Sequence, residues 1–221
     1  MKMITIEGAI GVGKSSLAKI LGERYGGIVK LERTDSELLE LWYKLTKSER
    51  QEMRVPFHTQ VEFLNRRHNM ILECMLDKKQ GLAILDRSIF TDTLFARLKY
   101  QEGEINELEW NSYNNIRDMA LREIESLPQK APHLTIYINA PFEVAEQRIA
   151  KRGRDIEVNA DDSMKCWFKT LHKKYHEFMV KEYNHSEVLV IDGSRDFAED
   201  KEYLKEVLDI IDTKLKELNL I

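Results

Sequence analysis

Cysteine is scarce in this sequence. The chain carries two, Cys74 and Cys166, which are too few for a disulfide framework and lack the paired spacing of a zinc site. No apolar run approaches the roughly 18 residues that a membrane span needs. The amino-terminal segment lacks the apolar stretch of a secretory signal peptide. These absences predict a cytoplasmic protein whose thiols are reduced.

Positive charge is not in excess either. The formal net charge is −4, and 33% of the residues are charged against 43% hydrophobic, a balance typical of a globular protein. Bulk attraction to nucleic acid or to a membrane surface is therefore not expected. The sequence also lacks repeats and Pro/Gly/Ser-rich linkers, so residues 1–221 are predicted to form one domain.

Short apolar runs alternate with long amphipathic segments. Strands are predicted at 3–8, 27–32, 81–86, 134–139 and 188–192, and helices at 14–25, 35–47, 57–79, 89–101, 105–126, 142–152, 161–183 and 197–217. Four of the strands are nearly continuous apolar runs, as in strands buried on both faces of a sheet, and 27–32 is weaker. The predicted fold class is α/β, with three layers and a five-stranded parallel sheet flanked by helices. Ligands of such sheets bind beyond the carboxyl ends of the strands.

The segment "GAIGVGKS" at 8–15 follows the first predicted strand and opens the first predicted helix. This context is the one that the phosphate-binding G-x-x-x-x-G-K-[ST] motif requires, so the fold is predicted to be of the P-loop NTPase type. Glycines let backbone N–H groups surround phosphate oxygens, and the helix start adds partial positive charge. Lys14 is expected to reach the β and γ phosphates of ATP, and Ser15 to ligate Mg²⁺. The predicted phosphate-binding residues are Gly8, Ala9, Ile10, Gly11, Val12, Gly13, Lys14, Ser15 and Ser16.

A second acidic position follows the third predicted strand. Asp86 ends "GLAILD", where an acid that organises the metal should lie beside the phosphate loop, and Arg87 comes next. The alternative is a strand-capping aspartate with a surface arginine. No base-reading motif of the NKxD kind follows, so a GTPase is not favoured.

The segment "EVAEQRIAKRGRDIE" at 143–157 carries three arginines. Arg148 and Arg152 are four residues apart and share a helix face, Gly153 is a natural helix stop, and Arg154 follows it. Guanidinium groups that converge in this way suit a polyanion such as phosphate. A solvated charged helix face is the alternative.

The chain resembles the deoxyribonucleoside kinase family, in particular its bacterial deoxyadenosine/deoxyguanosine kinase branch. The motifs occur in the family order across nearly the whole chain: "GAIGVGKS", Glu32, "FHTQVEFLNRR" (57–67), "LDRSIFTDTLFA" (85–96), "RIAKRGRDIE" (148–157) and "VLVIDGSRDF" (188–197). The resemblance implies ATP-dependent phosphorylation of a deoxyribonucleoside, with Mg²⁺, in nucleotide salvage. It also implies a homodimer through long helices, and from the overall likeness we expect a purine substrate.

The resemblance further implies a role for single residues. Glu32, Arg87 and Lys14 would be catalytic, with Glu32 accepting the proton of the 5′-hydroxyl. The nucleoside would contact Glu32, Tyr43, Gln60, Arg67, Arg87, Asp92 and Glu157. Arg148, Arg152 and Arg154 would belong to a lid at about 148–160 that closes over the triphosphate, and Arg195, Asp196 and Phe197 would surround the adenine of ATP. Ser15 and Asp86 would hold the metal.

Two other functions stay open at this point. A thymidylate-type nucleoside monophosphate kinase shares the phosphate loop, the strand-end Asp-Arg pair and a lid. Its acceptor is already anionic and needs extra positive charge, which Arg33 could supply directly after Glu32. A non-catalytic P-loop nucleotide sensor is the third reading, although such a protein would need fewer of these residues.

Overall fold

The protein is described by a computed structural model over residues 2–77, 81–127, 132–153 and 162–221. Five strands form one sheet in the order β2-β3-β1-β4-β5, and every neighbouring pair is parallel. The strands are β1 (Lys2–Glu7), β2 (Ile28–Lys30), β3 (Leu82–Asp86), β4 (Leu134–Asn139) and β5 (Glu187–Asp192). The predicted five-stranded parallel α/β sheet is confirmed.

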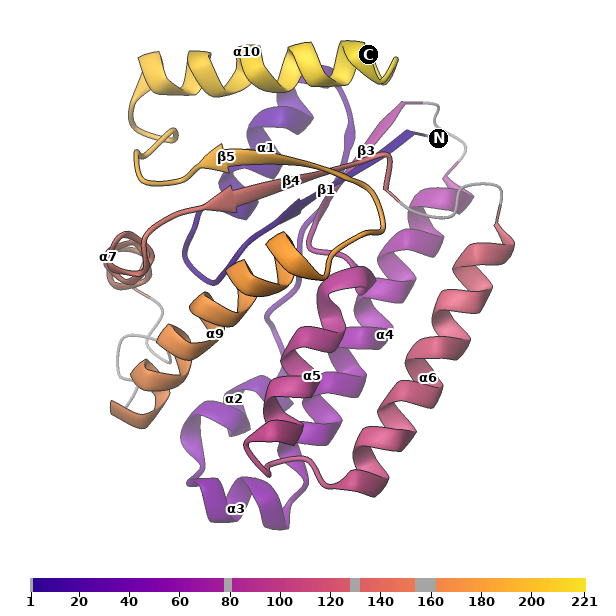
Figure 1. Ribbon diagram of the computed structural model, residues 1–221, viewed down its shortest axis with the longest axis vertical. Coiled ribbons are helices and arrows are strands. Elements are labelled where there is room, and N and C mark those ends of the chain that lie inside the picture. The colour runs from indigo at the N-terminus through magenta and orange to yellow at the C-terminus, as the bar shows by residue number, and fades with distance from the viewer. Residues whose placement is uncertain (1, 78–80, 128–131, 154–161) are drawn as a thin grey trace.

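Helices cover both faces of this sheet. Figure 1 shows α1 (Lys14–Tyr25) and α10 (Lys201–Glu217) on one side, and α4 (Val55–Leu76), α5 (Asp92–Gln101), α6 (Glu107–Ser126) and α9 (Asp162–Lys181) on the other. The other helices among the described residues are α2 (Glu37–Lys44), α3 (Lys47–Glu52), the 3₁₀ turn η1 (Ile89–Thr91) and α7 (Phe142–Arg152). The arrangement is the three-layer architecture that the strand–helix alternation predicts.

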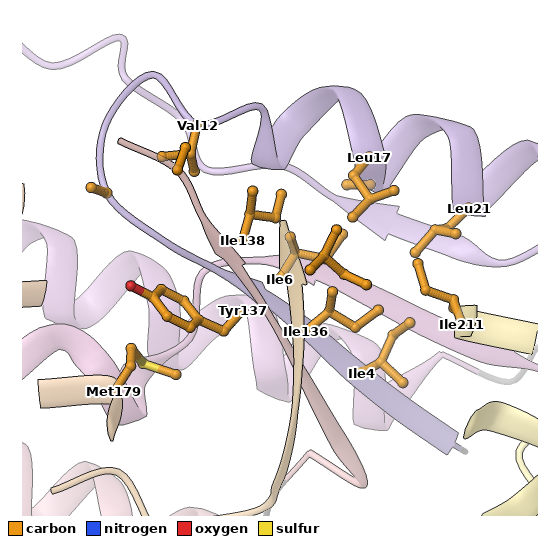
Figure 2. Packing of buried hydrophobic residues seen from close by; sticks show 14 of the residues in the cluster. Ile4, Ile6, Val12, Leu17, Leu21, Ile136, Tyr137, Ile138, Met179 and Ile211 are labelled. Carbon is orange, nitrogen blue, oxygen red and sulfur yellow. The ribbon is translucent and has the colours of Figure 1, made fainter. Parts of the chain in front are cut away.

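The core is built by alternation along the central strands. In Figure 2, Ile136 and Ile138 of β4 lie on the α1 side of the sheet, near Leu17, while Tyr137 between them points to the opposite side. All four are buried. Because successive strand residues face opposite sides, a strand with helices on both faces is apolar almost throughout, which explains the continuous apolar runs of the sequence.

The sheet order places the first strand at a switch point. From β1 the chain moves to β2 and β3 on one side, and later to β4 and β5 on the other. The crevice beyond the carboxyl ends of strands at such a point is where ligands bind in open α/β sheets. The phosphate loop follows β1, so it occupies that crevice.

The structure differs from the predicted elements most clearly after the second strand. The single helix predicted at 35–47 is two helices, because Leu45 is extended and Thr46 is the N-cap of α3. Thr46 and Glu49 form a reciprocal capping box, which satisfies backbone N–H groups at the start of α3. The edge strand β2 spans Ile28–Lys30, shorter than the predicted 27–32, so Glu32 lies beyond the ladder.

The sequence predicts reduced cysteines and no membrane span, and both predictions can be compared with the structure. Cys74 and Cys166 are free thiols, one buried and one exposed. Within the described ranges, no helix combines the length and the apolar character that crossing a membrane requires.

Candidate functional site

The phosphate loop joins β1 to α1 in a conformation that depends on glycine. Gly11 and Gly13 have φ of 85° and 104°, in the left-handed region that favours glycine. A Cβ on Gly11 would lie 2.5 Å from the carbonyl oxygen of Ala145, and one on Gly13 would lie 2.9 Å from the Phe197 ring. The loop is therefore packed closely between α7 and the segment that follows β5.

Lys14 starts α1 and turns back over this loop. Its Nζ donates a hydrogen bond to the carbonyl oxygen of Ala9 at 2.8 Å, and only 8% of the residue is exposed. Burial, together with the nearby Arg87 cation, lowers the pKa of Lys14 to about 7. Without a bound anion, the Lys14 ammonium therefore loses its proton readily at neutral pH.

Ser15 and Asp86 meet where the loop approaches the end of β3. The Ser15 hydroxyl donates to Asp86 Oδ2. Asp86 is buried, and its other oxygen, Oδ1, has no hydrogen-bond partner among the described residues. A buried carboxylate oxygen without a partner is costly unless a ligand completes it, so this pair fits a bound cation.

Glu32 lies between two arginines. Arg87 Nε donates to Glu32 Oε2 at 2.9 Å, and Arg67 Nε donates to Glu32 Oε1 at 3.1 Å. Burial opposes ionisation of Glu32, but the positive charges of Arg67 and Arg87 prevail and lower its pKa to about 2. The carboxylate is consequently charged throughout the neutral range.

Arg67 also reaches the first turn of α5. It donates to Asp92 Oδ1, and Asp92 Oδ2 accepts a second hydrogen bond from the Tyr113 hydroxyl at 2.5 Å. Asp92 has no exposed surface, and its burial raises its pKa while Arg67 opposes that change. One buried network thus ties the segment after β2 to α4, α5 and α6, although its members lie far apart in sequence.

One cavity is lined both by residues of the phosphate loop and by residues of the helices that follow β2 and β3. Its wall includes Lys14, Ser15, Glu32, Asp86 and Arg87. It also includes Leu39, Trp42, Tyr43, Thr59, Gln60, Phe63, Arg67, Phe95, Lys99 and Trp167. The structure therefore brings Tyr43, Gln60 and Arg67 to one cavity with Glu32, and places Asp92 behind Arg67.

Gln60 differs from the other polar residues of the wall. It is 9% exposed, and its amide makes no hydrogen bond within the described residues. Trp42, Phe63 and Phe95 line the same cavity. An amide among aromatic rings can pair with the edge of a planar heterocycle that the rings hold by stacking.

The arginines of the predicted lid have different surroundings. Arg148 donates to backbone carbonyl oxygens of Val12, Gly193 and Arg195, and so joins the phosphate loop to the segment after β5. Arg152 lines the cavity. Arg154 and Glu157 lie outside the described residues. The convergence of the three arginines on an anion stays a prediction.

The predicted adenine-binding segment follows β5. Arg195 forms ion pairs with Asp200 and Glu206, and its guanidinium lies 4.2 Å from the Tyr203 ring centroid. Asp196 is half-exposed, and its carboxylate accepts from the Ala198 backbone N–H. Phe197 is buried against Gly13. The segment borders the phosphate loop, but none of the three residues lines the cavity.

The sequence pattern did not indicate several residues of the site. Lys99 and Trp167 line the cavity, with the Lys99 ammonium 4.4 Å from the Trp167 ring centroid. Glu7 and Tyr175 lie behind Arg87 and bond to each other. Only the position of Glu7 at a strand end could have indicated it, because a lone Lys, Trp or Tyr on a helix is more often part of the core.

The parallel sheet with a Walker-type loop after its first strand defines a P-loop nucleotide-binding protein. The sequence pattern of the family described as "Deoxynucleoside kinase" matches residues 4–216, nearly the whole chain. The chain belongs to the deoxynucleoside kinase family.

Individual relatives agree with this assignment. A deoxyadenosine kinase of Lactobacillus acidophilus is 34% identical over 99% of this chain and 98% of its own length. A deoxyguanosine kinase of Lactobacillus johnsonii is 33% identical over 99% and 94%. The solved structure of a deoxyadenosine kinase from M. mycoides with dCMP and dCDP shares the fold, with a TM-score of 0.74 at 22% identity over 96% of this chain and 98% of that one.

Proposed function

We propose that this protein transfers the γ-phosphoryl group of ATP to the 5′-hydroxyl of a deoxyribonucleoside, with a purine base favoured. One observation carries the proposal: Glu32 lines the same cavity as Lys14 and Gln60. A neutral hydroxyl is a poor nucleophile, and a carboxylate that shares a cavity with a phosphate loop and a base-pairing amide is what its activation requires.

Glu32 accepts the hydrogen bond of the 5′-hydroxyl and takes up its proton as the bond to phosphorus forms. Its low pKa keeps it charged, and the loose transition state of phosphoryl transfer calls for proton removal only late. The two arginines hold the carboxylate in one orientation, so positioning contributes as much as basicity.

Cations surround the transferring group. Arg87 and Lys14 contact the phosphoryl oxygens, and Arg152, with Arg148 and Arg154, belongs to the lid at about 148–160. These interactions strengthen as negative charge redistributes in the transition state. We further assign Tyr43 and Glu157 to the sugar 3′-hydroxyl, Arg67 and Asp92 to the surroundings of the base, and Arg195, Asp196 and Phe197 to the adenine of ATP.

Ser15 and Asp86 would hold Mg²⁺, which neutralises phosphate charge when bound. The unpaired Asp86 Oδ1 supports this assignment. No cluster of three or more His, Cys, Asp or Glu side chains suited to a metal occurs in the part of the chain that the structure describes. A site with so few protein ligands leaves room for phosphate oxygens and water, as Mg²⁺ prefers.

The purine preference rests on the relatives. Full-length relatives are named deoxyadenosine kinase and deoxyguanosine kinase, and a Bacillus subtilis relative is named for deoxyadenosine and deoxycytidine. The Gln60 amide offers a donor and an acceptor side by side, which suits the edge of adenine or guanine. It also suits cytosine, so the choice of base needs a direct assay.

The position of Arg33 argues against a nucleoside monophosphate as the acceptor. Its side chain is 76% exposed and pairs with Asp35, and Arg33 does not line the cavity. A second anionic phosphate at the acceptor end would therefore not gain the extra cation that the alternative function requires.

A turnover panel tests the proposal. The protein is supplied with MgATP and each of four deoxynucleosides and four deoxynucleoside monophosphates, and ADP formation is measured. We expect turnover with deoxyadenosine or deoxyguanosine. Turnover restricted to monophosphates would replace the proposal with the alternative, and no turnover at all, with intact ATP binding, would favour the nucleotide sensor.

We also propose a cytoplasmic homodimer. Long helices α4 and α6 lie side by side (Figure 1), and Leu76, Leu108 and Met119 on them are exposed apolar residues. Sedimentation equilibrium of the full chain, with a monomer mass of 26.0 kDa, tests the stoichiometry.

A further inference from the structure

A carboxylate with no part in the transfer chemistry lies directly behind Arg87. Glu7, the last residue of β1, has no exposed surface. It makes no direct ion pair among the described residues and instead accepts hydrogen bonds from hydroxyl groups. The donors are Thr5 at 3.3 Å, Ser88 at 2.9 Å, Thr91 at 3.0 Å and Tyr175 at 2.5 Å. Burial raises the pKa of Glu7, and the field of Arg87 opposes that rise.

The Tyr175 hydroxyl connects this carboxylate to Arg87. Arg87 Nη1 donates to Tyr175 Oη at 3.1 Å. A guanidinium has no acceptor, so Tyr175 must accept there, and its single proton then points to Glu7. The direction of both hydrogen bonds is thus determined, from Arg87 through Tyr175 to Glu7. A negative charge at the end of the chain strengthens both bonds by polarising the hydroxyl between them.

Arg87 is restrained on its other sides as well. Its backbone lies at φ 69°, in the left-handed region, and its N–H donates to the Ile6 carbonyl oxygen. The guanidinium lies 5.1 Å from the Phe95 ring centroid and 5.4 Å from that of Tyr175. Nε is bonded to Glu32 and Nη1 to Tyr175, whereas Nη2 has no hydrogen-bond partner within the described residues. Arg87 lines the cavity, so its Nη2 is the guanidinium donor that is left for a ligand there.

We propose that Tyr175 is a positioning residue, which together with Glu7 holds Arg87 so that its Nη2 meets the transferring phosphoryl group. The inference rests on the proposed kinase function and adds two residues to it. If Glu7 were only a satisfied core carboxylate, the hydroxyls of Ser88 and Thr91 would already pair it, and the Tyr175 bond would not matter for catalysis. The positioning role predicts that loss of the Tyr175 hydroxyl lowers kcat, and a purely structural role predicts that it does not.

Tyr175→Phe removes that hydroxyl and keeps the ring against Arg87. We expect kcat to fall about ten- to a hundred-fold, as for loss of a hydrogen bond to a charged group, with KM for ATP and for the deoxynucleoside within about two-fold. Tyr137→Phe is the matched control: Tyr137 is 4% exposed, its ring stacks on Tyr175, and its hydroxyl bonds to Asn139 and His176 rather than to Arg87. Equal kcat values in the two variants would overturn the proposal.

A double-mutant cycle separates positioning from general loss of structure. In an Arg87→Lys background, Tyr175→Phe should change kcat by less than about two-fold, because the group that it positions is gone. The same fold-loss in both backgrounds would mean that Tyr175 acts independently of Arg87, and would overturn the proposal. If Tyr175→Phe does not fold, Glu7→Gln replaces it in the same cycle, with the same expectations.

A measurement without turnover keeps this inference separate from the kinase function. In ¹⁵N-labelled protein, the Nη1 and Nη2 protons of Arg87, assigned through Arg87→Lys, should be resolved in the wild type because rotation of the guanidinium is hindered. They should merge in Tyr175→Phe and stay resolved in Tyr137→Phe. Resolved signals in all three proteins would refute the positioning role, whereas a wild type that phosphorylates no deoxynucleoside but shows this pattern would refute the function alone.

Discussion

Binding of ATP should place a proton on Lys14. In the ligand-free protein, burial and the Arg87 cation lower the pKa of Lys14 to about 7, and its ammonium donates to the Ala9 carbonyl. Phosphate oxygens within reach of Nζ supply the negative charge that the buried ammonium lacks, and this raises its pKa again. Binding and protonation are therefore linked.

The size of the effect follows from the pKa. With a value of about 7, about one Lys14 side chain in ten carries its proton at pH 8, about half do at pH 7 and nearly all do at pH 5.5. If bound phosphate keeps Lys14 fully protonated, binding should take up about 0.9 proton at pH 8, about 0.5 at pH 7 and almost none at pH 5.5.

Isothermal titration calorimetry measures this number. MgATP is titrated into the protein, without acceptor, in pairs of buffers whose ionisation enthalpies differ, and the dependence of the observed enthalpy on the buffer gives the protons taken up. Lys14→Arg is the matched control, because a guanidinium stays charged at every pH of the series. Its uptake reports the titration of ATP and of all other groups, so the difference between the two proteins belongs to Lys14.

A difference near zero at pH 8 would refute the reasoning, since Lys14 would then be charged before ATP arrives.

The lowered pKa of Lys14 also has a consequence for stability. The folded-state pKa of Lys14 lies below its unfolded value of 10.5, so the unfolded chain binds more protons between about pH 7 and 10.5. The contribution of Lys14 to the free energy of unfolding should therefore increase as pH rises through this window in the ligand-free protein.

Three further predictions concern the proposed chemistry. Glu32→Gln should lower kcat by about 10²- to 10⁴-fold and leave ATP affinity near normal, and unchanged turnover would show that Glu32 is not the proton acceptor. Arg152→Ala should reduce kcat more than it raises the acceptor KM, while a pure KM defect in steady-state kinetics would indicate that Arg152 grips substrate instead. Asp86→Asn should raise the Mg²⁺ concentration for half-maximal rate at least about ten-fold, and an unchanged Mg²⁺ titration would remove Asp86 from the metal site.

The architecture was accessible from sequence because its signals are local. Continuous apolar runs indicate strands covered on both faces, and the glycines of the phosphate loop stand next to the lysine and serine that work with them. The amphipathic pattern over 35–47 predicts one helix and hides the break between α2 and α3, although Thr46 and Glu49 have capping-box spacing.

The site could be predicted only in part. Resemblance to a family indicated Glu32, Gln60, Arg67 and Arg87, and the structure brings them to one cavity. The resemblance could not indicate which groups Arg148 bonds to. Its partners are backbone carbonyl groups, and every residue has one, so the sequence does not distinguish them.

By itself, the sequence determined the strands, most of the helices and the phosphate loop, since these depend on neighbours within a few residues. Only the tertiary structure decided which polar side chains meet. Glu7 and Tyr175 are 168 positions apart, and Glu32 and Arg87 are 55 apart. The pKa values of Glu32 and Lys14 follow from such meetings and from burial, both of which exist only once the sheet and its helices have packed.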